Sequence, residues 1–191
     1  MTDIRLGILG STRGSNLLPL VETLAKRQVP FQINAVISNR EKAGILDKAQ
    51  SKGWPCWFCD PNGLSRTDYD GKLSALLEDA EVDLVVLIGF MRILSPEFVA
   101  QWRHRIINVH PSLLPDYAGL MDLAVHQAVL DDGRKETGCT VHEVSEEVDG
   151  GPILVQKRCP VMAEDTVETL KTKVQALEVL ALAEAIENRG K

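Results

Sequence analysis

The stretch from Asp83 to Ile88 constrains the fold more than any other part of the chain. It reads Asp-Leu-Val-Val-Leu-Ile and is bounded by Gly89. A strand that is apolar without alternation is covered on both faces, as are the strands of parallel sheets. The sequence therefore predicts a central strand of a parallel sheet, with helices packed on both sides.

Predicted strands and helices alternate along the chain around this run. That order is typical of an α/β fold, and we expect a Rossmann-like three-layer domain. Its central sheet would be mostly parallel, with helices on both faces and antiparallel strands in the C-terminal part. The expected strands cover Ile4–Leu9, Phe31–Ser38, Cys56–Cys59, Asp83–Ile88, Ile106–His110, Cys139–Val144 and Ile153–Val161, and the expected helices cover Leu17–Gln28, Glu41–Lys52, Ser65–Asp79, a segment starting at Ser95 and Pro96, Asp122–Leu130 and a long segment opening at Asp165 with Glu168.

Composition limits the class of protein. The 191 residues are 45% hydrophobic and 25% charged, which suits one globular domain over residues 1–191. The net charge of -6, without a Lys/Arg cluster, argues against a nucleic-acid partner. The longest apolar run, Leu84–Met91, is too short to span a bilayer, and the N-terminus lacks the features of a signal peptide. We therefore expect a cytoplasmic enzyme without a membrane partner.

The four cysteines do not indicate a metal or disulfide framework. Cys56 and Cys59 have the C-x-x-C spacing, but no second pair follows them. A chain without an export signal should keep its thiols reduced. We expect no disulfide, no bound metal and no redox role for this pair.

The segment from Ile106 to Pro115 carries the most chemistry. Pro111 ends a β-branched strand at His110, so Asn108 and His110 share one face at the strand's carboxyl end. An amide donor and an imidazole on one face suit acyl transfer, where an oxygen becomes negative and a proton must move. Alternatively, Asn108 closes a turn and His110 is a hydrogen-bonded histidine at a strand end.

A glycine-bearing loop, Gly10–Asn16, joins the first strand to the first helix. Small residues let backbone N–H groups approach an anion, and the helix N-terminus favours negative charge. The loop therefore predicts a phosphate site, although many α/β proteins use glycine here only for packing. It does not spell Gly-x-Gly-x-x-Gly, which disfavours a dinucleotide.

The run from Asn108 to Pro115, followed by Tyr117-Ala118-Gly119, resembles the signature of the folate-dependent formyltransferases. The resemblance implies formyl transfer from 10-formyltetrahydrofolate to the amine of glycinamide ribonucleotide, in purine synthesis, without a metal. Asn108 and protonated His110 would stabilise a tetrahedral oxyanion. Asp149, in the Asp-Gly-Gly-Pro turn, would support His110, although a turn aspartate is usually a turn former.

The same resemblance assigns the remaining binding residues. The ribonucleotide phosphate and glycinamide would contact Gly14, Ser15, Asn16, Gln175 and Glu178, and the folate would contact Arg66, Met91, Arg92, Ile93, Leu94 and Asn108. On residue grounds alone, Arg66 is a solvated arginine and the apolar residues are core. His126 reads as a surface or core histidine, and we assign no chemistry to His142.

The chain departs from the family pattern at two loops. Thr12 stands where familiar members have glycine, and Arg13 stands where they have a short uncharged residue. Leu120-Met121-Asp122 replaces a histidine-bearing stretch, so the loop beside the site should differ in shape. The pattern does not assign a role to Arg13.

Two other interpretations remain open. One is a relative with the same chemistry: formyltetrahydrofolate hydrolase adds an N-terminal regulatory domain and methionyl-tRNA formyltransferase a basic C-terminal one, and we expect neither extension. The other is a non-catalytic nucleotide- or phosphate-binding α/β module, in which Asn108, His110 and Asp149 would not matter. We expect small-molecule partners and a monomer or homodimer.

Overall fold

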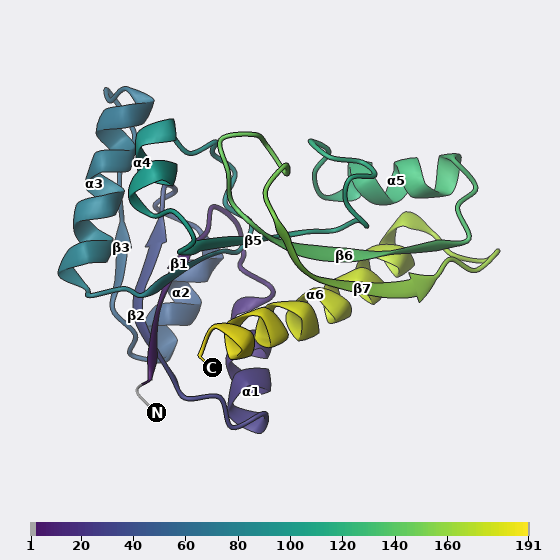
Figure 1. Cartoon of the computed structure of the whole chain (residues 1–191), viewed down its shortest axis with the longest axis horizontal. Helices are drawn as coiled ribbons and strands as arrows, with labels where there is room; N and C mark the ends of the chain where they lie inside the picture. The colour runs from purple at the N-terminus through teal and green to yellow at the C-terminus, as the bar shows by residue number, and fades with distance from the viewer. Residues whose placement is uncertain (1–2, 191) are drawn as a thin grey trace. The chain divides into compact units, whose positions relative to one another are not determined.

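The computed structural model describes residues 3–190, and these form two compact units. The first unit extends through Asn108 and includes Gly190, and the second runs from Val109 to Arg189. Figure 1 shows the order of the elements along the chain. Each unit is described below by itself.

The first unit is built on a parallel sheet. Its strands lie in the order β3-β2-β1-β4-β5. All four residues of β4 are buried, as the aliphatic run predicted for a central strand. The strands are β1 (Ile4–Leu9), β2 (Phe31–Ser38), β3 (Cys56–Phe58), β4 (Leu84–Leu87) and β5 (Ile106–His110), the last of which continues into the second unit.

Helices cover both faces of this sheet. The helices are α1 (Leu17–Lys26), α2 (Gly44–Ser51), α3 (Arg66–Asp79) and α4 (Pro96–Gln101). From β1 through β2 to β3 the chain moves in one direction across the sheet. From β4, on the other side of β1, to β5 it moves in the opposite direction. Because such crossovers are right-handed, this reversal places α1 and α2 on one face and α3 and α4 on the other. Contacts within each helix pair agree with that placement (Figure 1).

The helix boundaries confirm two predicted starts and shift others. Ser65 and Ser95 cap α3 and α4, because their side chains accept hydrogen bonds from Asp68 N and Phe98 N. The helix expected from Glu41 begins only at Gly44, since the backbone at Ala43 is extended. The helix expected to reach Gln28 ends at Lys26, and Gln28 has a positive φ of 58° that a helix cannot continue.

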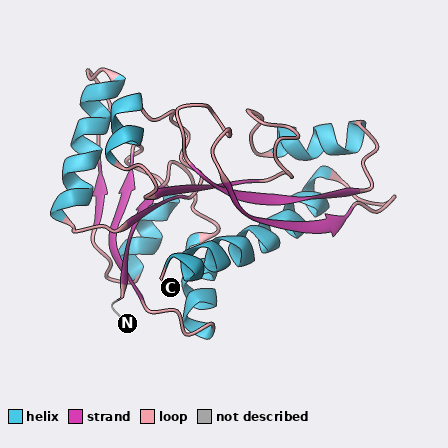
Figure 2. Cartoon of the chain, viewed as in Figure 1, coloured by secondary structure: helices cyan, strands magenta, loops and turns pink. Residues whose placement is uncertain are grey.

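The second unit contains an antiparallel hairpin and a long helix. Strands β6 (Glu136–Glu143) and β7 (Ile153–Pro160) pair antiparallel, as expected for the C-terminal part. The long helix α6 (Val167–Arg189) packs against both strands and against α5 (Leu123–Asp131) (Figure 2). Both parts of the predicted fold class are therefore confirmed.

The start of α6 corrects the predicted cap by one residue. We expected Asp165 and Glu168 to form the capping pair. Instead, Thr166 N donates to Thr169 Oγ1 at 2.9 Å and Thr169 N donates to Thr166 Oγ1 at 3.3 Å. Asp165 lies one residue too early for that exchange, and it accepts from Lys173 Nζ at 2.7 Å, which lowers the pKa of Asp165 to about 2.

Residues 3–190 lack two features that mark other classes of protein. No helix in that range combines the length and apolar character needed to cross a membrane. No group of three or more His, Cys, Asp or Glu side chains among the same residues could hold a metal ion.

His126 is a buried histidine of α5. Its side chain is 2% exposed, and its Nδ1 atom has no hydrogen-bond partner within the described part of the chain. Burial lowers the pKa of His126, Lys171 lowers it further, and Asp122 opposes them. The folded protein therefore holds this imidazole neutral where the unfolded chain would protonate it.

This arrangement predicts a loss of stability in acid. His126 contributes stability above its unfolded pKa of about 6.5, and that contribution is lost as the pH falls through the lower folded value. Thermal unfolding between pH 8 and 5 should show a smaller decline for His126→Leu than for the unmodified protein. Val129→Ala, at a buried position of the same helix without a titratable group, should leave the decline unchanged. Identical profiles for all three proteins would contradict the assignment.

Candidate active site

The carboxyl ends of the parallel strands form the candidate site of the first unit. Asn108 on β5 is in register with Leu87, the last residue of β4. The loops that follow β1 and β4 leave the sheet at the same edge. Ligands of open α/β sheets bind where the strand order reverses, which here is the boundary between β1 and β4.

The predicted phosphate loop is shaped by Gly14. Its φ is +62°, and a Cβ atom there would lie 2.5 Å from Cγ1 of Ile45 on α2. Leu17 N donates to Gly14 O at 3.1 Å and Ile45 N donates to Thr12 O at 3.2 Å, so the loop is held between α1 and α2. Glycine is therefore required here for packing and for backbone conformation, whatever the loop binds.

Ser15 and Asn16 follow Gly14 at the start of α1. Ser15 is half-buried, and Asn16 is the residue before the helix. Lys48 of α2 donates through Nζ to the backbone oxygen of Arg13, whose own side chain is exposed. Lys48 thus places a cation beside the loop. No sequence motif indicated this lysine.

Ser11 joins the phosphate loop to the loop after β4. Its N–H donates to Gly89 O at 2.9 Å, and its Oγ accepts from Met91 N at 2.8 Å. The same hydroxyl donates to Oδ1 of Asn39, just beyond β2, at 2.5 Å. Three strand ends are thereby tied together by one buried serine. Sequence reasoning missed Ser11 and Asn39, although polar residues directly after two strands were a usable signal.

The predicted folate residues differ in exposure. Ile93 is 59% exposed and Met91 is also exposed, whereas Leu94 is buried in the core. Arg92 lies over the ring of Tyr69 on α3, with Cζ 4.5 Å from the ring centroid. Arg66 is exposed on the first turn of α3. The loop therefore presents two apolar side chains while Arg92 and Leu94 anchor it.

The end of this loop is held by Asp70. Its Oδ2 atom accepts from Ser95 N at 2.5 Å, and the side chain is fully enclosed. Burial raises the pKa of Asp70, while the Ser95 hydrogen bonds and the charges of Arg92 and Arg66 lower it. Asp70 thus secures the junction between the loop and α4.

In the second unit, His110 and Asp149 come together. Nε2 of His110 lies 3.3 Å from Oδ2 of Asp149 and 3.0 Å from the backbone oxygen of Leu120. The same Oδ2 atom accepts from Gly119 N at 2.9 Å. The loop that departs from the family pattern therefore contacts both members of the predicted pair.

His142 is a third member of this cluster. Its Nε2 atom lies 3.6 Å from Oδ1 of Asp149, and its Nδ1 atom lies 2.9 Å from the backbone oxygen of Glu143. The Asp149 carboxylate is therefore placed between two imidazoles. Sequence reasoning assigned no chemistry to His142; its place on the strand that leads into the Asp149 turn was the available signal.

Burial and charge act in opposite directions on this cluster. Burial, the largest influence, holds the pKa of His110 below its ordinary value, and His142 lowers it further, although the Asp149 charge and the Leu120 carbonyl raise it. Burial alone would raise the pKa of Asp149, but contacts with His142 and Gly119 and the charge of His110 lower it below its ordinary value. Asp149 is thus an anion that opposes the loss of the His110 proton.

The backbone of the turn sets the position of Asp149. Its φ is +55°, a left-handed conformation that aspartate and asparagine tolerate better than most residues. Glu143 N donates to Pro152 O at 2.9 Å, which closes the end of the hairpin. A Cβ atom on Gly151 would lie 1.8 Å from the backbone oxygen of Glu143, so only glycine fits there.

Gln175 and Glu178 lie one turn apart on α6, and both are half-buried. The charge of Glu178 acts on buried Cys139 of β6, where burial and that charge raise the thiol pKa to about 12. Glu178 therefore faces the hairpin. The predicted ribonucleotide role of both residues stays a prediction.

The chain was compared with protein families and with curated proteins. The family model described as Formyl transferase matches residues 4–186. A phosphoribosylglycinamide formyltransferase from Escherichia coli (strain K12) is 38% identical over 90% of this chain and 80% of its own length. The trifunctional purine biosynthetic protein adenosine-3 of Gallus gallus is 40% identical over 96% of this chain. This chain matches only 18% of that longer protein's length.

Solved structures agree with the sequence comparisons. Glycinamide ribonucleotide transformylase 1 from Symbiobacterium toebii is similar with a TM-score of 0.92 and 38% identity. The match covers 98% of this chain and 88% of that one. The α/β architecture predicted from the strand and helix order is thus that of a known family.

The turn geometry predicts different effects for two adjacent glycines. Gly151→Ala places a Cβ against backbone, which typically costs about 1–3 kcal/mol in overpacking, and it should displace Asp149. The pKa of His110 should then fall. Gly150→Ala is the matched control, because the atoms nearest its Cβ belong to the Glu147 side chain, which can rotate away, and not to backbone. Urea unfolding and an NMR titration of His110 would measure both effects; equal effects of the two variants would contradict this account.

Proposed function

The chain belongs to the formyl transferase family, and from that premise we propose that it transfers a formyl group from 10-formyltetrahydrofolate to the amine of glycinamide ribonucleotide. This reaction is a step of de novo purine synthesis. The observation that carries the proposal is the contact of 3.3 Å between buried His110 and Asp149, on a chain similar over most of its length to a bacterial enzyme of that name. No metal is required.

The proposed chemistry follows from the groups at the ends of the strands. The substrate amine attacks the formyl carbon, a C–N bond forms, and the formyl oxygen becomes negative. Nε2–H of His110 and the amide of Asn108 donate to that oxygen, which takes the place of the Leu120 carbonyl on Nε2. The bond from the carbon to the folate nitrogen then breaks. The proton of the amine passes to that nitrogen, and Asp149 stabilises the imidazolium meanwhile.

In this proposal the two substrates are bound by different residues. The ribonucleotide is bound by Gly14, Ser15, Asn16, Gln175 and Glu178, and the folate by Arg66, Met91, Arg92, Ile93, Leu94 and Asn108. Backbone N–H groups at the start of α1 and the nearby Lys48 cation support phosphate at the first loop. The exposed Met91 and Ile93 side chains support an apolar ring at the second. Buried Leu94 would contribute through its backbone.

The remaining properties are proposals of the same kind. Residues 1–191 act as a single formyltransferase domain in the cytoplasm, with small molecules as its ligands and no nucleic-acid or membrane partner. The protein is a monomer or a homodimer, and sedimentation velocity distinguishes these two states.

The test is an assay with both substrates that separates three outcomes. Formylated ribonucleotide together with tetrahydrofolate supports the proposal. Formate without formylated ribonucleotide indicates a hydrolase, in which water replaces the amine. Binding of the ribonucleotide without any product indicates a non-catalytic module.

The catalytic assignment predicts large losses of kcat. Removing one oxyanion donor costs about 2.7–4 kcal/mol, so Asn108→Ala and His110→Ala should each lose roughly a hundredfold or more. Asp149→Asn keeps the left-handed backbone but removes the charge that supports imidazolium, so its kcat and the His110 pKa should both fall. Steady-state kinetics with circular dichroism as a folding check would measure this. Near-normal kcat in folded His110→Ala would overturn the mechanism.

The phosphate assignment predicts an effect confined to one substrate. Ser15→Asp puts a negative charge where the phosphate would bind, so it should raise the KM for the ribonucleotide by tenfold or more, an order-of-magnitude expectation for one repulsive charge. Ser15→Asn, similar in size but neutral, is the control. The KM for the folate should change little in either variant. Equal effects of the two variants, or equal effects on both substrates, would remove Ser15 from the phosphate site.

A further inference from the structure

Ser112 is a buried side chain in direct contact with His110. Its Oγ atom lies 2.9 Å from Nδ1 of His110, on the opposite side of the ring from Asp149. The same Oγ atom donates to the backbone oxygen of Asp116 at 2.5 Å. Ser112 is 0% exposed, so water does not compete for these contacts.

The two contacts of Ser112 determine where its hydrogen lies. A backbone carbonyl only accepts hydrogen bonds, so the short contact with Asp116 requires the single hydroxyl hydrogen of Ser112. Ser112 Oγ can then offer only a lone pair to His110. The 2.9 Å contact is therefore a hydrogen bond that Nδ1–H of His110 donates.

The other ring nitrogen faces acceptors as well. Nε2 of His110 contacts the Leu120 carbonyl and the Asp149 carboxylate. The charged or titratable groups around the ring are Asp149 and His142, with no others acting on it among the described residues. An imidazole with acceptors at both nitrogens is best satisfied when both carry hydrogen.

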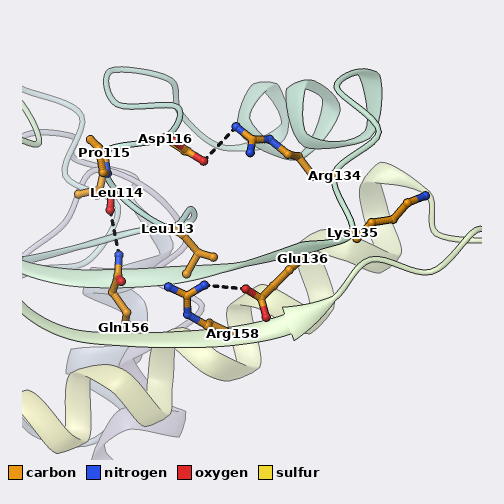
Figure 3. Close-up of a pocket in the computed structure, with 9 residues that line it drawn as sticks. All are labelled: Leu113, Leu114, Pro115, Asp116, Arg134, Lys135, Glu136, Gln156 and Arg158. Atoms are coloured by element: carbon orange, nitrogen blue, oxygen red, sulfur yellow. Dashed lines mark hydrogen bonds and ion pairs between the residues drawn. The ribbon is translucent and has the colours of Figure 1, made fainter.

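A buried network holds Ser112 in place. Oγ1 of Thr140, on β6, donates to Ser112 O at 2.7 Å and accepts from Leu114 N at 3.0 Å. Gln156 of β7 donates through Nε2 to the same Oγ1 at 3.0 Å. The same Nε2 atom donates to Leu114 O at 3.0 Å (Figure 3). The hairpin therefore fixes the backbone on both sides of Leu113.

The cavity in Figure 3 lies against this network. Its volume is about 420 Å³, and Leu114, Asp116 and Gln156 are among its lining residues. Two ion pairs lie in its lining: Arg134 with Asp116 at 3.0 Å and Arg158 with Glu136 at 2.6 Å. The first pair holds the residue whose carbonyl takes the Ser112 hydrogen. The residues that line this cavity therefore support the loop that carries Asp116, and we assign the cavity no ligand.

We propose that Ser112 is a positioning residue that keeps Nδ1 of His110 protonated, so that the N–H directed at the formyl oxygen during formyl transfer is the one on Nε2. The contacts of Ser112 stand by themselves, and the catalytic consequence rests on the proposed function. Ser112 touches neither substrate in this scheme. It acts only through the imidazole, as hydrogen-bonded partners of metal-bound or catalytic histidines do.

The test is an NMR titration of His110 in protein labelled with 15N-histidine, in the unmodified chain and in Ser112→Ala. Loss of an acceptor for Nδ1–H destabilises the imidazolium, so the pKa of His110 should fall in the variant. If Ser112 instead donated to Nδ1, the same change would raise that pKa. A rise, or no change, overturns the proposal.

Kinetics provide a second readout. Because imidazolium is the active form, the high-pH limb of the kcat profile should move to lower pH in Ser112→Ala, and kcat at neutral pH should fall about tenfold or more. The KM values should stay within about twofold, since Ser112 does not touch substrate. Ser51→Ala removes an exposed hydroxyl that donates to Lys48 O, and as matched control it should change neither readout.

Two measurements keep the proposal falsifiable if Ser112→Ala does not fold. Ser112→Cys replaces the hydroxyl with a weak acceptor and should shift the pKa in the same direction. The unmodified protein needs no variant: its Nδ1 must stay protonated throughout the titration, and a neutral ring protonated on Nε2 overturns the proposal. The tautomer is observed without substrate, so a failed formyl-transfer assay with a protonated Nδ1 would reject the proposed function and leave the role of Ser112 intact.

Discussion

The negative charge of Asp149 is the feature on which the site of the second unit depends. A carboxylate in a mostly buried position is costly unless its oxygens are paired. Here one oxygen receives the Gly119 N–H and faces His110, and the other faces His142. The left-handed backbone at Asp149 and the absence of a side chain at Gly151 let the turn reach that position. Displacing the turn would leave an unpaired charge and two imidazoles without their anion.

The imidazole of His110 is held from two sides by different means. Asp149 supplies a charge at Nε2, whereas Ser112 supplies a neutral oxygen at Nδ1. Burial penalises the charged ring, so both contacts oppose the same cost. The segments that provide these two contacts are both held by the β6–β7 hairpin. The end of the hairpin fixes the Asp149 turn, and Thr140, within the hairpin, fixes Ser112. The hairpin is thus the common support of both sides.

In the first unit the hydroxyl of Ser11 connects several segments in a comparable way. Ser11 bonds to the loop after β4 through Gly89 and Met91, and to the end of β2 through Asn39. The two loops assigned to different substrates therefore share a hydrogen-bonded junction at the sheet edge. If the backbone of either loop moves, the hydrogen bonds of Ser11 must change. The positions of the two loops are therefore coupled even when no ligand is bound.

Local sequence patterns were sufficient wherever the deciding interactions are local. The aliphatic run of β4, the strand end imposed by Pro111 and the caps at Ser65 and Ser95 all follow from backbone sterics and short-range hydrogen bonds. The placement of Asn108 and His110 on one strand needs only the alternation of side chains. The family resemblance pointed to Asp149, because its turn motif is contiguous.

Tertiary structure alone decided which groups meet across long separations in the chain. That Asp149 lies between His110 and His142, that Leu120 and Gly119 contact the same pair, and that Ser112 is locked by Asp116 and Thr140 could not be read from spacing. The cap of α6 is another example. Thr166 caps this helix instead of Asp165, and Asp165 forms an ion pair with Lys173. Sequence determines which groups a segment can offer, whereas packing and the cost of burying charge determine which partners they find.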